Sequence, residues 1–143
     1  LKFLNKHLDE VKYFAAAGEA GLHVKHNTNL SSDIVIYEKV TLQNSALTGK
    51  YFEQPPLVVI EIDIQAETAD LGMSQVDYYS LKTQKLLDFG VKEVFWFFSS
   101  IKKVVFAKQG HDWITTDWTK ELTLLETYKF SLADLLTKEG WQF

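Results

Sequence analysis

Apolar residues recur at helical spacing in three parts of the chain. In residues 3–17 they fall three and four positions apart, which is typical of an amphipathic helix. Residues 74–89 repeat this spacing and are followed by Gly90, a residue type that often comes just after a helix. Residues 131–136 begin with Ser131, a favoured N-cap. The pattern therefore predicts helices over 3–17, 74–89 and 131–136.

Strand patterns fill the segments between these helices. Runs of β-branched and aromatic residues predict strands at 20–25, 33–37, 57–65, 93–98, 103–107, 113–116 and 122–124. Residues 41–54 are polar and contain turn-forming residues, which predicts a loop. The order helix, strands, helix, strands is that of an α/β or α+β domain with a mixed central sheet flanked by helices.

The length of the chain fits one domain. We find no internal repeat and no linker, so residues 1–143 are predicted to form a single unit. Hydrophobic residues make up 46% of the chain and aromatic residues 14%, which is enough to build a core. The chain begins with Leu1 rather than Met, which is consistent with a missing N-terminal segment.

Two acidic residues interrupt the most apolar strand, residues 57–65 (LVVIEIDIQ). Side chains alternate between the faces of a strand, so Glu61 and Asp63 share one face while the other face stays apolar. Both faces begin apolar, which indicates a central strand that is covered on both sides. The acids come toward its C-terminal end, where α/β sheets commonly bind ligands.

Asp33 opens the predicted strand 33–37 and is a candidate neighbour of these acids. If that strand lies beside 57–65, Asp33 and Glu61 converge, and their negative charges repel. A divalent cation would remove this repulsion, and oxygen ligands suit Mg²⁺ or Mn²⁺. The alternative is that the acids lie near a sheet edge and form salt bridges with lysines.

Lys82 interrupts an apolar stripe of the predicted helix 74–89, between Tyr78 and Leu86. Such a lysine often extends along the apolar surface with its ammonium in water. It could instead aim the ammonium at the carboxylates across the sheet. There it could position a metal-bound water or stabilise charge on a phosphate.

Composition excludes several classes of function. The chain has no Cys, which rules out disulfides, Cys-ligated zinc and thiol nucleophiles, and fits a reducing cytoplasm. No apolar run approaches about 18 residues, so no membrane span and no membrane partner are expected. The net charge is −4, so any contact with nucleic acid must rest on local basic residues or on a metal.

Three motifs follow one another in a fixed order. They are residues 32–36 (SDIVI), residues 56–62 (PLVVIEI), and Lys82 placed eight residues before the segment 90–96 (GVKEVFW). In this order they resemble the Uma-two-type restriction endonuclease family of the PD-(D/E)xK superfamily. The late segment 130–135 (FSLADL) is similar to the closing segment of that family, so the resemblance covers about residues 15–136.

This resemblance implies a restriction-endonuclease-like fold and a metal-dependent endonuclease that hydrolyses phosphodiester bonds of nucleic acid, with DNA favoured over RNA. The cofactor would be Mg²⁺ or Mn²⁺. Carried over to this chain, Asp33 and Glu61 would be metal ligands, with the backbone carbonyl of Ile62 as a further ligand. Lys82 would serve as the catalytic lysine.

The resemblance is not uniform at the candidate site. The superfamily lysine usually lies two residues after the Glu on the same strand, but that position is Asp63 here. Asp63 could widen the metal site or pair with Lys82. Glu19 is similar to an acid that some superfamily members place near the first helix.

Two other functions stay open at this point. One is a catalytically degenerate nuclease fold that binds a partner and cuts nothing. The other is an oligomerising module, for example a homodimer, in which the aromatic strand 94–98 lies in an interface.

Overall fold

The computed structural model describes residues 2–25, 28–44, 51–52, 54–63 and 75–140. Nine strands and four helices lie within these ranges. The helices are α1 (Lys2–His7), α2 (Lys39–Asn44), α3 (Gln75–Phe89) and α4 (Leu132–Lys138). The strands are β1 (Tyr13–Lys25), β2 (Thr28–Glu38), β3 (Tyr51–Phe52), β4 (Val58–Asp63), β5 (Glu93–Phe98), β6 (Lys103–Lys108), β7 (Ile114–Asp117), β8 (Leu122–Leu124) and β9 (Tyr128–Phe130).

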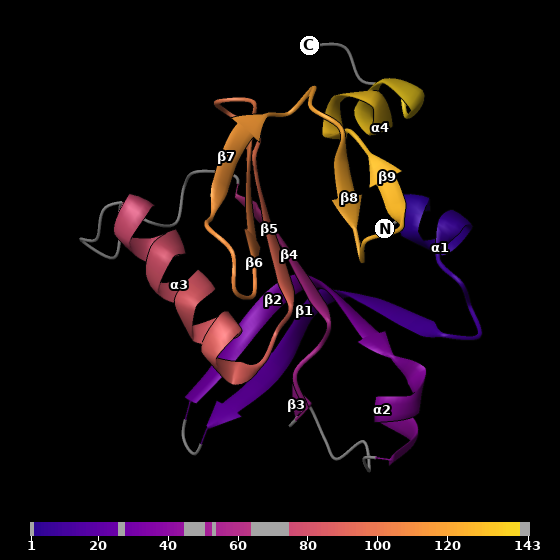
Figure 1. Ribbon diagram of the computed structural model, residues 1–143, viewed down its shortest axis with the longest axis vertical. Helices are drawn as coiled ribbons and strands as arrows, with labels where there is room; N and C mark the ends of the chain where they lie inside the picture. The colour runs from indigo at the N-terminus through magenta and orange to yellow at the C-terminus, as the bar shows by residue number, and fades with distance from the viewer. Residues whose placement is uncertain (1, 26–27, 45–50, 53, 64–74, 141–143) are drawn as a thin grey trace.

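Seven strands form one mixed sheet in the order β3-β1-β2-β4-β5-β6-β7. β4 runs parallel to β5 and antiparallel to β2, and the remaining pairs are antiparallel except β1 with β3. Figure 1 shows α3 along one side of the sheet, with α1, α4 and the β8–β9 hairpin on the other. The predicted α/β class, with a mixed central sheet flanked by helices, is confirmed.

β4 lies in the middle of the sheet because it has apolar neighbours on both faces. Val58 and Ile60 point into one core, which also holds Leu4 of α1 and Ala133 of α4. Val59 points into the second core, against α3. This alternation matches the two-sided burial that the sequence predicts for the strand, and it places Glu61 on the α3 side.

The prediction of one helix over residues 3–17 is wrong in its second half. α1 ends at His7, and the carbonyl and carboxylate of Asp9 then bind the amides of Val11, Lys12 and Tyr13 in a turn. From Tyr13 the chain forms β1, whose amides and carbonyls pair with β2. Pairing along a long neighbouring strand therefore outweighs the helix propensity of the alanine-rich segment.

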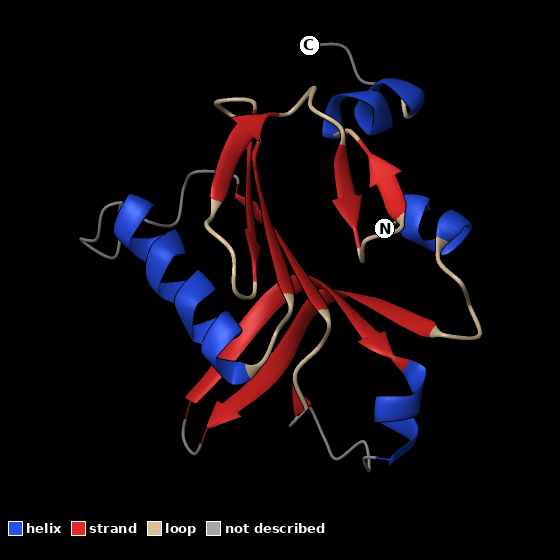
Figure 2. Cartoon of the chain, viewed as in Figure 1, coloured by secondary structure: helices blue, strands red, loops and turns tan. Residues whose placement is uncertain are grey.

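Two smaller differences appear in the rest of the described chain. The predicted loop over residues 41–54 begins as α2, whereas residues 45–50 and 53 lie outside the described residues. Strand β9 was not predicted; it pairs with β8 to form a separate hairpin. The other predicted helices and strands occur close to their expected positions (Figure 2), including α4, where the Ser131 hydroxyl caps the helix by accepting from the Asp134 amide.

The C-terminus of α3 is tied to the sheet, which fixes the helix that carries Lys82. Gly90 adopts a φ of +121°, and its amide donates to the carbonyls of Leu86 and Leu87. The Gln109 side chain, just after β6, donates to the carbonyls of Leu87 and Val91. The turn from α3 into β5 is thus held by hydrogen bonds from both sides.

Replacing Gly90 with alanine should therefore destabilise the protein. A Cβ atom at this position would lie 3.0 Å from Pro55 Cγ, and the backbone angle is one that L-residues rarely adopt. We expect Gly90→Ala to lower the free energy of unfolding by about 2 kcal/mol or more, measured by urea denaturation.

Gly110→Ala is the matched control, because Gly110 has a φ of +77° but open space around the position of a Cβ. Its loss should be smaller, about 1 kcal/mol. Equal losses for the two variants would show that the contact with Pro55 does not restrain the turn.

Candidate active site

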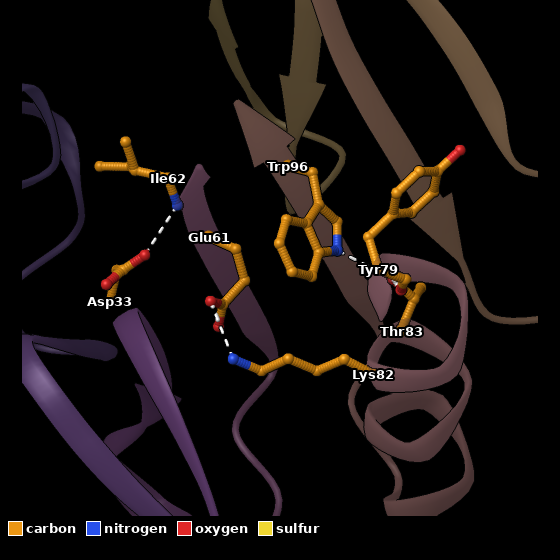
Figure 3. A network of polar contacts seen from close by, with 7 residues as sticks. All are labelled: Asp33, Glu61, Ile62, Tyr79, Lys82, Thr83 and Trp96. Atoms are coloured by element: carbon orange, nitrogen blue, oxygen red, sulfur yellow. Dashed lines mark hydrogen bonds and ion pairs between the residues drawn. The ribbon is translucent and has the colours of Figure 1, made fainter. Parts of the chain in front are cut away.

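The pairing of β2 with β4 brings Asp33 to Glu61. Ile34 lies opposite Ile60 in the antiparallel register, so the next step along the ladder places the two acids side by side. The Asp33 carboxylate accepts a hydrogen bond of 2.7 Å from the backbone amide of Ile62 through Oδ2 (Figure 3). This hydrogen bond engages Oδ2, so Oδ1 is the oxygen of the Asp33 carboxylate that could bind a cation beside Glu61.

Glu61 is nearly enclosed, since only 5% of the residue is exposed. Its Oε2 atom forms an ion pair with Lys82 Nζ at 3.0 Å. Its Oε1 atom is buried and has no hydrogen-bond partner among the described residues. A buried carboxylate oxygen without a hydrogen-bond partner is costly, so this atom is a candidate to bind a cation.

Burial raises the pKa of the Glu61 carboxyl above its ordinary value, and the nearby Asp33 charge raises it further. The Lys82 ammonium opposes both effects by charge and by hydrogen bonding. The Ser32 hydroxyl is near enough to lower this pKa slightly, but it does not reach hydrogen-bond geometry with the carboxylate. Glu61 therefore depends on a cation to remain ionised.

Lys82 comes from α3 and crosses to the sheet. Its side chain is only 13% exposed, and its ammonium points toward Glu61 rather than into water (Figure 3). The predicted apolar stripe of α3 is confirmed on both sides of Lys82, because Leu86 is fully buried and Tyr78 packs against the same core. The structure thus brings Asp33, Glu61 and Lys82 together on the α3 side of the sheet.

The remaining candidates lie less close to this cluster or beyond what is described. Ile62 contributes its amide to Asp33, while its side chain is 44% exposed on the opposite face. Asp63 ends β4, and Glu19 lies in β1 at an irregularity of the β1–β2 ladder between Ala17 and Ala20. The side chains of Asp63 and Glu19 lie outside the described part of the structure.

The cluster fits a hard divalent cation. Within the described ranges no three His, Cys, Asp or Glu side chains gather in one place, so Asp33 and Glu61 are the two carboxylates there that could hold a cation. Two carboxylates, with one buried oxygen unpaired, match the preference of Mg²⁺ for a few protein oxygens and several waters.

Two neighbours of Lys82 were not predicted as part of the site. Thr83 and Trp96 are both buried, and the Trp96 indole donates a hydrogen bond of 2.8 Å to the Thr83 hydroxyl. Trp96 stands directly opposite Glu61 in the parallel β4–β5 register. The sequence signal for this pair was present: Thr83 adjoins Lys82, and Trp96 ends the segment 90–96.

Comparison with known proteins supports the fold but no family assignment. No protein-family model matches the chain, and no curated protein matches it. A crystal structure from Anabaena variabilis, described as "a putative nuclease belonging to DUF820", superposes with a TM-score of 0.73. The two sequences are 13% identical, and the match covers 95% of this chain and 75% of that chain. At this identity the likeness is one of fold, and the Uma-two-type resemblance stays a prediction.

No helix of the described chain has the length and apolar character needed to cross a membrane.

The raised pKa of Glu61 gives a prediction for stability in the absence of metal. Because the folded state binds this proton more tightly than the unfolded state, the contribution of Glu61 is most favourable below pH 4.5 and declines as pH rises through the folded pKa. The free energy of unfolding of the parent minus that of Glu61→Gln should therefore fall as pH rises from 4.5. The slope should not exceed about 1.4 kcal/mol per pH unit.

Urea denaturation in the presence of a chelator measures this difference. Glu126→Gln is a control for which the same difference should change with pH in the opposite direction, because the hydrogen bond from Lys108 lowers the pKa of the exposed Glu126. A parent–Glu61→Gln difference that stays constant or increases above pH 4.5 would contradict the buried state of Glu61.

Proposed function

We propose that this protein is a metal-dependent nuclease that hydrolyses phosphodiester bonds of nucleic acid, with DNA as the favoured substrate. The observation that carries the proposal is the meeting of Asp33, Glu61 and Lys82 on one face of the sheet, where Glu61 Oε1 is buried and has no hydrogen-bond partner in the described part of the chain. The fold shared with a protein described as a putative nuclease adds support.

In this proposal Asp33 and Glu61 are the metal ligands. The Ile62 amide orients Asp33, and Lys82 orients Glu61, so both carboxylates are preorganised for binding a metal. Bound Mg²⁺ or Mn²⁺ would supply an activated water and neutralise charge on the scissile phosphate. The Ile62 carbonyl and the Asp63 carboxylate are further candidate ligands.

Lys82 acts beside these carboxylates. A lysine ammonium has three donors, and the contact with Glu61 Oε2 uses one of them. The others can donate to the attacking water or to a phosphate oxygen, where charge increases as the water oxygen bonds to phosphorus. The attacking water gives up a proton to solvent as its oxygen bonds to phosphorus, and the leaving oxygen takes a proton from solvent when its bond to phosphorus breaks.

The net charge of −4 is compatible with this function because the site does not depend on a basic surface. Two carboxylates would repel a phosphate strongly without a cation. A bound divalent cation together with the Lys82 ammonium reverses the sign of the local charge. Nucleic-acid binding at this site should therefore require metal.

A cleavage assay tests the proposal. The purified protein is incubated with supercoiled plasmid and with single-stranded DNA, in Mg²⁺, in Mn²⁺ and in a chelator. We expect cleavage with metal and none with the chelator. Glu61→Gln and Lys82→Met should each lower the cleavage rate by about a hundredfold or more, since each removes a group that acts on the transition state.

Lys108→Met is the matched control, because Lys108 forms an ion pair with the exposed Glu126 and stands opposite Glu93, at the other end of β5 from Trp96 and Phe98. It should retain the parent rate. If neither metal supports cleavage, calorimetry with Mn²⁺ separates the alternatives: an inert scaffold that binds a partner should bind no Mn²⁺, and that result would reject the nuclease proposal.

A further inference from the structure

The side chain of Trp96 contacts both the helix that carries Lys82 and the lysine itself. Trp96 lies in β5 opposite Glu61, is 2% exposed, and faces α3. Its indole therefore fills the space between the sheet and the segment of α3 from which Lys82 extends (Figure 3).

The indole N–H holds α3 through a two-step chain of hydrogen bonds. Trp96 Nε1 donates to Thr83 Oγ1 at 2.8 Å, and the same hydroxyl donates to the Tyr79 carbonyl at 2.6 Å. Thr83 is fully buried, so neither bond can be exchanged for water. Because Thr83 directly follows Lys82, this contact fixes both the rotation and the height of Lys82 on the helix.

The ring face of Trp96 borders the lysine ammonium. Lys82 Nζ lies 5.8 Å from the ring centroid, within the range of a cation–π contact. The ring itself has little freedom to turn, since it stacks on Phe98 and meets Tyr78 edge to face. One immobile side chain thus restrains Lys82 at its backbone and at its charged end.

We propose that Trp96 is a positioning residue that holds the Lys82 ammonium over Glu61, acting through the Thr83 hydroxyl and through the face of its own ring. The catalytic consequence rests on the proposed nuclease function. The ordering of the ammonium does not, because it is a property of the metal-free protein.

Such a restraint is needed because a lysine side chain has four rotatable bonds and reaches many positions from one helix site. The ion pair with Glu61 fixes the ammonium at one atom only. If Glu61 also bound a metal cation, the attraction between its carboxylate and the Lys82 ammonium would weaken. The contacts with Trp96 remain, so Lys82 keeps its place when the ion pair is shared with other groups.

Two substitutions separate this role from ordinary packing. Trp96→Phe keeps an aromatic ring but removes the N–H donor, and Thr83→Val keeps the shape of the side chain but removes the hydroxyl. Thr83→Ser keeps the hydroxyl and should behave like the parent. Val94→Ala is the matched control, because Val94 lies on the same face of β5 and is fully buried, yet its aliphatic side chain makes none of the hydrogen bonds or ring contacts through which Trp96 meets α3.

The first measurement is the ¹⁵N-detected ammonium signal of Lys82 in the metal-free protein, assigned with Lys82→Met. Lysine ammonium signals of this kind are observed when the group is ordered and protected from exchange. We expect the signal in the parent, in Thr83→Ser and in Val94→Ala, and its loss by broadening in Trp96→Phe and Thr83→Val. Persistence of the signal in both latter variants, or its equal loss in Val94→Ala, would overturn the proposal.

The second measurement is a double-mutant cycle on the single-turnover cleavage rate. Trp96→Phe should lower the rate about tenfold in the parent and produce little further loss in Lys82→Met, because it acts through the lysine. An equal loss in both backgrounds would contradict a positioning role. If the ammonium signal responds as expected but the parent cleaves neither DNA substrate, the nuclease proposal fails while the positioning role of Trp96 stands.

Discussion

The burial of one carboxylate sets the conditions for the rest of this site. Glu61 lies on a central strand of a seven-stranded sheet, directly after the buried apolar residues 58–60, and only 5% of the Glu61 residue is exposed. An isolated charge there would be strongly destabilising, so the fold has to bring a cation to it. Lys82 of α3 supplies this cation through its ammonium. The site therefore depends on the orientation of α3, which the hydrogen-bonded turn at Gly90 helps to fix.

Much of this arrangement could be read from the sequence because it depends on short-range pattern. The alternation in β4 placed Glu61 on one face, and the helical spacing around Lys82 showed that a charge lay within a buried stripe. That β2 and β4 are neighbours was a hypothesis about topology, and the antiparallel register of the two strands confirms it. Once those strands pair, the meeting of Asp33 and Glu61 follows from geometry alone.

The features that escaped prediction depend on contacts between distant segments. Residues 13–17 have an alanine-rich helical pattern, but pairing with β2 makes them a strand. Glu93, the first residue of β5, is buried and accepts a hydrogen bond from the Leu125 amide, which lies 32 positions away. The bond between Trp96 and Thr83 likewise requires the packing of α3 on the sheet. No local spacing encodes such partners.

The amide of Ile62 shows how a residue can matter without its side chain. What orients the Asp33 carboxylate is a main-chain N–H, a group that nineteen of the twenty amino acids would supply equally at this position. Nearly half of the residue is exposed, so its side chain is less constrained by packing than the buried positions of β4. Proline is the one amino acid that lacks this N–H, so a comparison of side chains alone would not reveal one of the atoms on which the acidic cluster is built.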